Sequence, residues 1–172
     1  MCMKNAKNNS TREWEEIRCP KDLVTAKRRI DLLVVHCSAT RQQDRYLPPQ
    51  LIHDHKQRGF STAGYHYYIT RDGRLYALRH VDKAGAHVIG YNAFSIGICY
   101  EGGLDSNYRP HDTRTPQQRQ MLAQLVWHLR NRYPTAMVVG HRDLSPDRNG
   151  DGSITPDEWL KVCPCFDAQI YN

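Results

Sequence analysis

The sequence predicts a single α/β domain in which a central mixed β-sheet is flanked by α-helices. Short apolar and β-branched segments alternate with segments of helical periodicity, which is the pattern of strands and helices that share one core. The chain has 172 residues, which suits one domain. Hydrophobic residues make up 40% of the chain and charged residues 24%, so a packed core can form and a disordered chain is excluded.

Five segments have the composition of β-strands. The first is a buried apolar run that ends in His36 and Cys37. The second and third are joined by Asp72-Gly73, a turn signal that predicts a hairpin. The predicted strands are residues 30–37, 65–70, 75–79, 95–100 and 136–139.

Two longer helices are predicted. Residues 48–58 begin with Pro48 and stop at Gly59, and a second helix begins at Thr115-Pro116 and ends before Pro134. The second helix has one apolar face, formed by Met121, Leu122, Leu125, Val126 and Leu129.

Less regular segments lie at both ends of the chain. Residues 1–28 are polar and are expected to form a loosely attached N-terminal extension to a domain of residues 29–172, with a short helix at 13–18. Another short helix is expected to begin at Thr155-Pro156 and to carry Trp159 and Leu160.

The charge balance favours polyanionic partners. Lys and Arg number 24 against 18 Asp and Glu, a net charge of +6, which suits nucleic acid or an anionic cell wall. The basic residues are scattered and no aromatic stacking motif accompanies them, so no nucleic-acid partner is expected.

We expect no membrane span, since no apolar run approaches about 20 residues. The first twenty residues lack a secretory apolar stretch, so we expect the protein to be cytoplasmic as synthesised. We also expect it to be a monomer.

Two histidines and a cysteine are candidates for a zinc site. His36 ends one predicted strand, His141 follows another, and Cys163 lies in Lys161-Val162-Cys163-Pro164-Cys165. Neutral imidazole and thiolate, with an open fourth position, are the ligands of catalytic zinc. These residues are far apart in the sequence, so the alternative stays open that each histidine is a hydrogen-bonded structural residue.

Four motifs occur in an order that resembles a known family. They are His36-Cys37-Ser38-Ala39-Thr40, Gly64-Tyr65-His66-Tyr67, His87-x-x-Gly90-Tyr91-Asn92-x-x-x-Ile96-Gly97-Ile98 and Lys161-x-Cys163-Pro164. Together they resemble the zinc-dependent N-acetylmuramoyl-L-alanine amidases of the bacteriophage-lysozyme type, which are related to the peptidoglycan recognition proteins. The similarity runs from about residue 30 to residue 167, and four motifs in register are far more specific than any one of them.

The resemblance implies a function and a set of site residues. The chain would hydrolyse the amide bond between N-acetylmuramic acid and L-alanine in peptidoglycan, with Zn²⁺ as cofactor and peptidoglycan or muropeptide as substrate. The implied zinc ligands are His36, His141 and Cys163. The implied catalytic residues are Tyr65 and Lys161, and the implied substrate-groove residues are His87 and Asn92. Cys165 stands where relatives often have Ser and is not expected to be a ligand. An enzyme of this kind would act on the cell wall, for example after phage-type release.

Elementary chemistry agrees with these roles. Zinc lowers the pKa of bound water to about 7 and polarises the amide carbonyl. In an extended segment Lys161 emerges on the same side as Cys163, where an ammonium can stabilise an oxyanion. The Tyr65 phenol can donate a hydrogen bond. No carboxylate stands out as a general base. A non-catalytic peptidoglycan-binding module of the same fold is the alternative, and loss of the thiolate ligand would mark it.

Residues 147–158 match the twelve-residue EF-hand calcium loop. Oxygen ligands at alternate positions converge on a hard cation, and Gly152 at the sixth position allows the sharp turn. The predicted calcium ligands are Asp147, Asn149, Asp151, the backbone carbonyl of Ser153, and Glu158. A plain Asp/Asn/Gly turn is the alternative. Bound calcium would fix the segment that presents Lys161 and Cys163.

Overall fold

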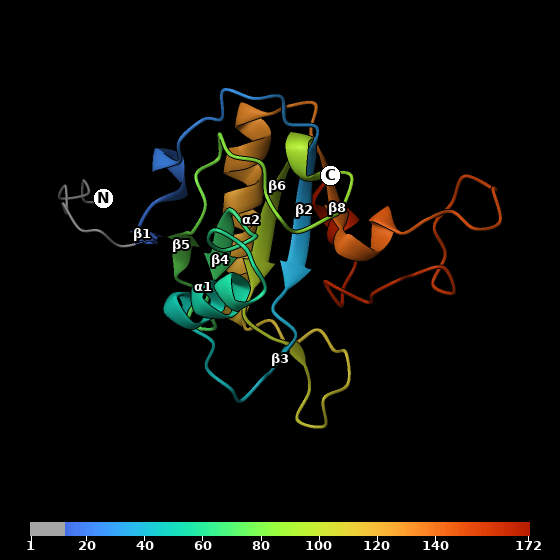
Figure 1. The fold of residues 1–172 in the computed structure, drawn as a ribbon, viewed down its shortest axis with the longest axis horizontal. Helices are drawn as coiled ribbons and strands as arrows, with labels where there is room; N and C mark the ends of the chain where they lie inside the picture. Colours follow the sequence, from blue (N-terminus) through green and yellow to red (C-terminus); the bar gives the residue numbers. More distant parts are fainter. Residues whose placement is uncertain (1–12) are drawn as a thin grey trace.

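A computed structural model describes residues 13–172 of the protein and contains a six-stranded mixed sheet (Figure 1). The strand order is β1-β5-β4-β6-β2-β8. Strands β4, β6, β2 and β8 are parallel, whereas β5 pairs antiparallel with β4 and β1. The strands of this sheet are β1 (Glu15–Ile17), β2 (Leu32–Cys37), β4 (Tyr67–Ile69), β5 (Leu75–Ala77), β6 (Ser95–Tyr100) and β8 (Met137–Gly140). A second, two-stranded sheet pairs β3 (Thr40–Arg41) with β7 (Gly103–Leu104).

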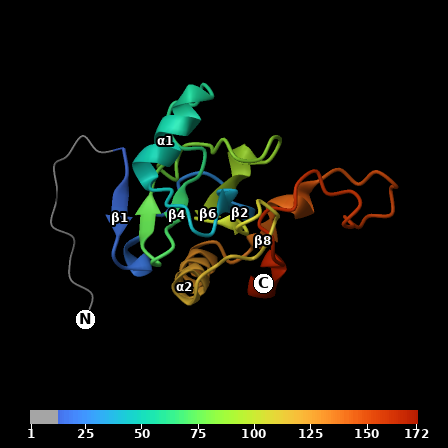
Figure 2. The same ribbon diagram turned by 90° about the horizontal axis from the view of Figure 1, so that it is seen from below.

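Two α-helices cover opposite faces of the large sheet (Figure 2). They are α1 (Pro48–Gln57) and α2 (Pro116–Arg132). The predicted α/β class with a central mixed sheet is therefore confirmed. Short 3-10 helices are η1 (Pro20–Asp22), η2 (Asn92–Phe94), η3 (His141–Leu144) and η4 (Ala168–Tyr171). Within residues 13–172, none of the helices combines the length and the apolar character needed to cross a bilayer.

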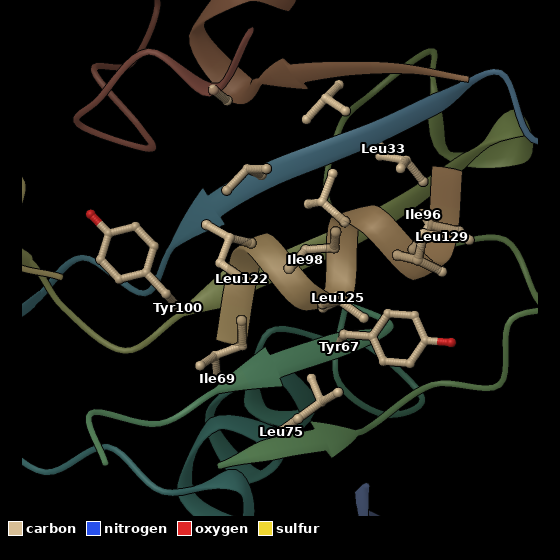
Figure 3. Packing of buried hydrophobic residues seen from close by; sticks show 14 of the residues in the cluster. Leu33, Tyr67, Ile69, Leu75, Ile96, Ile98, Tyr100, Leu122, Leu125 and Leu129 are labelled. Atoms are coloured by element: carbon tan, nitrogen blue, oxygen red, sulfur yellow. The ribbon is translucent and has the colours of Figure 1, made fainter. Parts of the chain in front are cut away.

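Helix α2 packs its apolar stripe on the sheet, as its spacing predicts (Figure 3). Leu122, Leu125 and Leu129 are fully buried against alternate residues of β2 and β6, such as Leu33 and Ile98. Side chains alternate between the two faces of a strand, so His36 faces away from α2. His36 therefore lies on the face of the sheet opposite α2.

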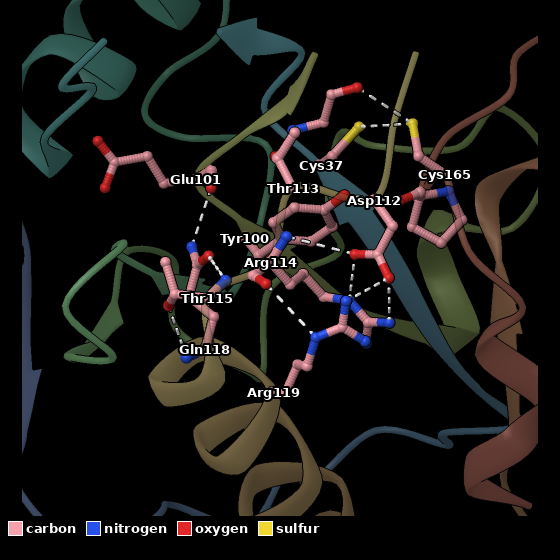
Figure 4. Close-up of polar contacts among 12 residues, drawn as sticks. Cys37, Tyr100, Glu101, Asp112, Thr113, Arg114, Thr115, Gln118, Arg119 and Cys165 are labelled. Atoms are coloured by element: carbon pink, nitrogen blue, oxygen red, sulfur yellow. Dashed lines mark hydrogen bonds and ion pairs between the residues drawn. The ribbon is translucent and has the colours of Figure 1, made fainter. Parts of the chain in front are cut away.

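The start of α2 is fixed by the predicted Thr115 cap. The Thr115 hydroxyl accepts from the Gln118 N–H at 3.1 Å, and the Gln118 side-chain oxygen accepts from the Thr115 N–H at 3.0 Å (Figure 4). This reciprocal pair is a capping box. The Gln118 amide also donates to the carbonyl of Glu101 at 2.9 Å, which ties the helix to the end of β6.

Two predicted short helices are wrong. The segment 13–18 contains strand β1, whose Ile17 is only 8% exposed and pairs with Leu75 of β5. Pairing and burial thus outweigh the helix propensity of its glutamates. The segment after Thr155 is a turn, since the Glu158 carboxylate accepts from the N–H groups of Arg148, Asn149 and Thr155.

The described part of the expected N-terminal extension is attached to the domain. Strand β1 joins the sheet, and the Ala26 N–H donates to the Tyr133 hydroxyl at 2.6 Å. Glu13 forms an ion pair with Lys56 of α1. Residues 13–28 are therefore not loosely docked, and the rest of the expected extension lies outside the described residues.

The carboxyl ends of β2, β6 and β8 meet at one edge of the sheet, because these strands are parallel and adjacent. His36 is the penultimate residue of β2, and His141 directly follows β8. Open parallel sheets place their ligand sites at this edge. The topology thus brings two of the predicted ligands together.

Candidate active site

His36, His141 and Cys163 form a compact group of metal-ligating side chains. Each offers one ligand atom, and the three atoms all lie within 4.8 Å of one another. Nδ1 of His36 lies 3.9 Å from Sγ of Cys163, although 127 residues separate them in the sequence. The rings of His36 and His141 have centroids 4.8 Å apart. The fold therefore assembles the set that the resemblance implies.

Backbone contacts hold the cysteine segment against this edge. The Arg142 N–H donates to the carbonyl of Cys163 at 2.9 Å, and the Tyr100 hydroxyl donates to the carbonyl of Pro164 at 2.7 Å. The Cys37 N–H points to Sγ of Cys163 at 3.2 Å. This hydrogen bond fixes the Cys163 sulfur beside His36.

Burial keeps the two histidines neutral. Burial, together with the charges of His87, His141 and Lys161, lowers the pKa of His36 well below its ordinary value. Burial and then the Lys161 charge lower the pKa of His141 to about 4. Neutral imidazole has a free lone pair, so both rings can bind a cation at neutral pH.

The two predicted catalytic residues lie around this group. Tyr65 lies two residues before β4, so the strand predicted at 65–70 begins later than expected. The ring centroid of Tyr65 is 5.1 Å from that of His36. Burial raises the pKa of the Tyr65 phenol well above 10, so the hydroxyl stays protonated and can donate. Lys161 is exposed, and its charge acts on both His36 and His141.

The two predicted groove residues have well-defined contacts. Nδ1 of His87 lies 3.0 Å from Nε2 of His36, and Nε2 of His87 lies 3.2 Å from the Ser95 hydroxyl. The Asn92 side-chain oxygen accepts from the N–H groups of His87 and Val88 at 2.8 and 3.1 Å. Asn92 therefore shapes the loop that carries His87. A contact with substrate stays a prediction for both residues.

The other two cysteines near the site form a separate contact (Figure 4). Sγ of Cys165 lies 3.9 Å from Sγ of Cys37 and donates to the carbonyl of Gly103 at 3.3 Å. Contact with the Cys163 sulfur and burial raise the pKa of Cys37 to about 12. Contact with Cys37 and burial raise the pKa of Cys165 as well. Both are therefore thiols at neutral pH, outside the ligand group.

The predicted calcium loop projects from the body of the protein beyond η3 (Figure 1). Its carboxylates accept hydrogen bonds from the loop's own backbone. Asp147 accepts from the N–H groups of Gly150 and Gly152 at 2.6 and 2.8 Å. Within residues 13–172, the loop forms no group of three acidic, His or Cys ligands with metal spacing. Calcium binding by Asp147, Asn149, Asp151, Ser153 and Glu158 stays a prediction.

Residues 26–156 match the protein family described as N-acetylmuramoyl-L-alanine amidase. The chain belongs to this amidase family. The match ends before Lys161 and Cys163, whose roles are implied by the resemblance of the four motifs.

Individual relatives of the amidase agree. The endolysin of Klebsiella phage KP32 is 35% identical over 145 residues, which are 84% of this chain and 87% of the endolysin. A peptidoglycan-recognition protein of Drosophila melanogaster is 30% identical over 129 residues, 72% of this chain and 68% of that protein. Among solved structures, the endolysin amidase LysCS from Clostridium intestinale URNW is 27% identical, with a TM-score of 0.62 and 85% of each chain covered.

The protein is therefore an enzyme, an N-acetylmuramoyl-L-alanine amidase that acts on peptidoglycan. The alternative of a non-catalytic binding module is set aside. Sequence reasoning missed the contact between His36 and His87. It also missed the hydrogen bonds from the Cys37 N–H to Cys163 and from the Tyr100 hydroxyl to Pro164. One signal was available for the first contact. Gly97 stands inside a strand, where glycine often marks the close approach of another group.

Proposed function

We propose that this amidase is zinc-dependent and that His36, His141 and Cys163 hold the metal. The observation that carries the proposal is the convergence of one buried imidazole, one half-buried imidazole and one thiol to within 4.8 Å, in an enzyme of this family. Two nitrogens and one sulfur are ligands that zinc favours. Three protein ligands also leave a further position, as catalytic zinc sites require.

The donor chemistry of these residues fits zinc. Both histidines are neutral near neutral pH, so no proton competes for their lone pairs there. The sulfur accepts the Cys37 N–H, which compensates part of its charge. A structural role would instead leave each imidazole bonded to a protein partner on both nitrogens. For His36, Nδ1 faces the Cys163 sulfur at 3.9 Å, which is long for a strong hydrogen bond.

Residues around the metal group would have separate roles in amide hydrolysis. Bound zinc would supply Lewis-acid chemistry, activating water and polarising the scissile amide. Lys161 brings a positive charge to the solvent side of the group, where it stabilises the negative charge that develops on the amide oxygen. The protonated Tyr65 hydroxyl is a donor beside His36 and orients the amide or the water.

Two serine variants test the ligand assignment. Cys163→Ser removes the proposed thiolate. Cys165→Ser is the matched control, because this cysteine lies two residues away and outside the ligand group. We expect one zinc per chain in the wild type and in Cys165→Ser, and loss of both zinc and lysis of purified peptidoglycan in Cys163→Ser. Zinc and lysis retained in Cys163→Ser, or lost equally in both variants, would contradict the assignment.

The phage relatives support a proposal for the place of action. We propose that the amidase is made in the cytoplasm and acts on the cell wall as a monomer, in the manner of an endolysin. The similarity to the KP32 endolysin supports this proposal. Light scattering during size-exclusion chromatography tests the monomer, and a dimer mass would overturn it.

A further inference from the structure

The ring of His87 occupies a slot between two glycines. A Cβ placed on Gly97 of β6 would lie 2.6 Å from Cδ2 of His87, and a Cβ on Gly85 would lie 2.3 Å from the same atom. For Gly97 the three nearest atoms all belong to His87. Any other residue at these two positions would therefore push the ring out of place. The slot is built for this side chain.

The loop that carries His87 is fixed as firmly as the ring. The Asn92 oxygen accepts from the N–H groups of His87 and Val88. Val88 is buried against Val34 of β2 and Val139 of β8. The backbone of His87 is thus tied to the two strands that carry the proposed histidine ligands.

The contacts of His87 fit the tautomer of His36 that zinc binding at Nδ1 requires. Nδ1 of His36 faces Cys163, so it is the atom that would bind zinc, and the ring proton must then sit on Nε2. Nε2 lies 3.0 Å from Nδ1 of His87, which can accept that proton. His87 then carries its own proton on Nε2, which faces the Ser95 hydroxyl at 3.2 Å.

We propose that His87 is a positioning residue of the metal site, which holds His36 in the tautomer and orientation that present Nδ1 to zinc. This inference rests on the proposed zinc function and gives His87 a role other than contact with substrate. A histidine ligand is commonly oriented by an acceptor on its second nitrogen, and loss of that acceptor lowers metal affinity about 10- to 100-fold.

Two substitutions of His87 separate this role from simple packing. His87→Asn places an amide oxygen near the position of Nδ1 and so keeps an acceptor for His36. His87→Gln places its amide near the position of Nε2, keeps a partner for Ser95 and loses the acceptor. We expect His87→Gln to bind zinc about 10- to 100-fold more weakly than wild type, and His87→Asn to recover most of that loss. Zinc affinity is measured by competition with a chromophoric chelator, without substrate.

A substitution outside the histidine gives a second test. Gly97→Ala adds a methyl group in the His87 slot and changes no polar group. We expect weaker zinc binding and an altered visible spectrum of the Co²⁺-substituted protein, since the ligand geometry shifts. In a His87→Ala background, Gly97→Ala should have no further effect on zinc affinity, because the ring it displaces is gone. Thermal unfolding of the metal-free variants checks the fold, and Gly97→Ala serves if His87→Gln does not fold.

The outcomes distinguish this inference from the proposed function. A wild type that binds no zinc would overturn both. A wild type that binds zinc with unchanged affinity in His87→Gln would overturn the role of His87 alone. Unchanged zinc affinity with a raised KM for muropeptide would instead assign His87 to the substrate groove. Equal zinc loss in His87→Asn and His87→Gln would also overturn the inference, since only packing would then matter.

Discussion

Protonation of His66 should destabilise the metal-free protein in mild acid. His66 is fully buried, its Nδ1 accepts from the Gly97 N–H at 3.0 Å, and its Nε2 lies 3.0 Å from the carbonyl of Lys83. Burial, with the positive charges of Arg28 and Arg79, lowers the pKa of His66 from 6.5 to about 4. A second ring proton would displace the Gly97 N–H from its acceptor.

The magnitude follows from the two pKa values. The unfolded chain takes up this proton near pH 6.5, whereas the folded chain takes it up only near pH 4. The contribution of neutral His66 to the free energy of unfolding is therefore fully present above pH 6.5 and is lost as the pH falls towards 4. Each pH unit within this window costs up to about 1.36 kcal/mol, which gives about 2.6 kcal/mol at pH 4.5.

Urea unfolding in the presence of chelator measures this loss. His66→Asn is the matched variant, since its amide oxygen can accept the Gly97 N–H and does not titrate. Between pH 7.5 and 4.5 the wild type should lose about 2.6 kcal/mol more free energy of unfolding than the variant. His66 lowers the pKa of His87, but that pKa, about 3, lies below the pH range of the measurement. Histidines whose pKa does not depend on His66 titrate alike in both proteins and cancel. Equal losses in the two proteins would refute the reasoning.

Three further predictions concern the site and the projecting loop. Lys161→Met should lower kcat about 10²- to 10³-fold and leave zinc content unchanged, because the residue stabilises charge and does not hold the metal. Leu160→Met, at a 64% exposed neighbour, is the control, and equal rates in both variants would contradict the role of the lysine. Zinc binding at pH 6 should release no proton from His141, whose pKa burial lowers to about 4, or from His36, whose pKa burial lowers well below its ordinary value. Calorimetry in buffers of different ionisation enthalpy should therefore find at most the one proton of the cysteine thiol, and two or three would show that the histidines are protonated. Calcium should raise the Tm of the zinc-loaded protein, and Asp147→Ala should abolish the rise. A Tm unaffected by millimolar calcium would identify the loop as a plain turn.

Periodicity predicted the central elements because local pattern and tertiary environment agree there. Strand β6 spans the predicted 95–100, and α2 begins after the predicted Thr115 cap. The helix prediction for residues 13–18 was wrong because pairing with β5 outweighs the helix propensity of its residues. The helix prediction after Thr155 was wrong because the Glu158 carboxylate, which could have stabilised the start of a helix, instead accepts hydrogen bonds from three N–H groups of the loop.

The site was less accessible to sequence reasoning than the fold. Residues 36, 141 and 163 have no informative spacing. Residue type and strand-end position made them candidates, and the resemblance implied them as the ligand set. Their convergence arises from the parallel pairing of β2 with β8 and from the backbone contacts of Cys163. Gly97 signals only that some group approaches β6 closely, and it does not indicate which side chain or in which orientation. The bond between His36 and His87 therefore emerged only from the three-dimensional structure.

Mass spectrometry of muropeptides after digestion tests the central claim most directly. Metal-free amidase should leave the bond between N-acetylmuramic acid and L-alanine intact, and one equivalent of zinc should restore its cleavage and release peptides with free amino-terminal L-alanine. Full cleavage by the metal-free protein, or none after zinc is returned, would contradict a reaction built on His36, His141 and Cys163.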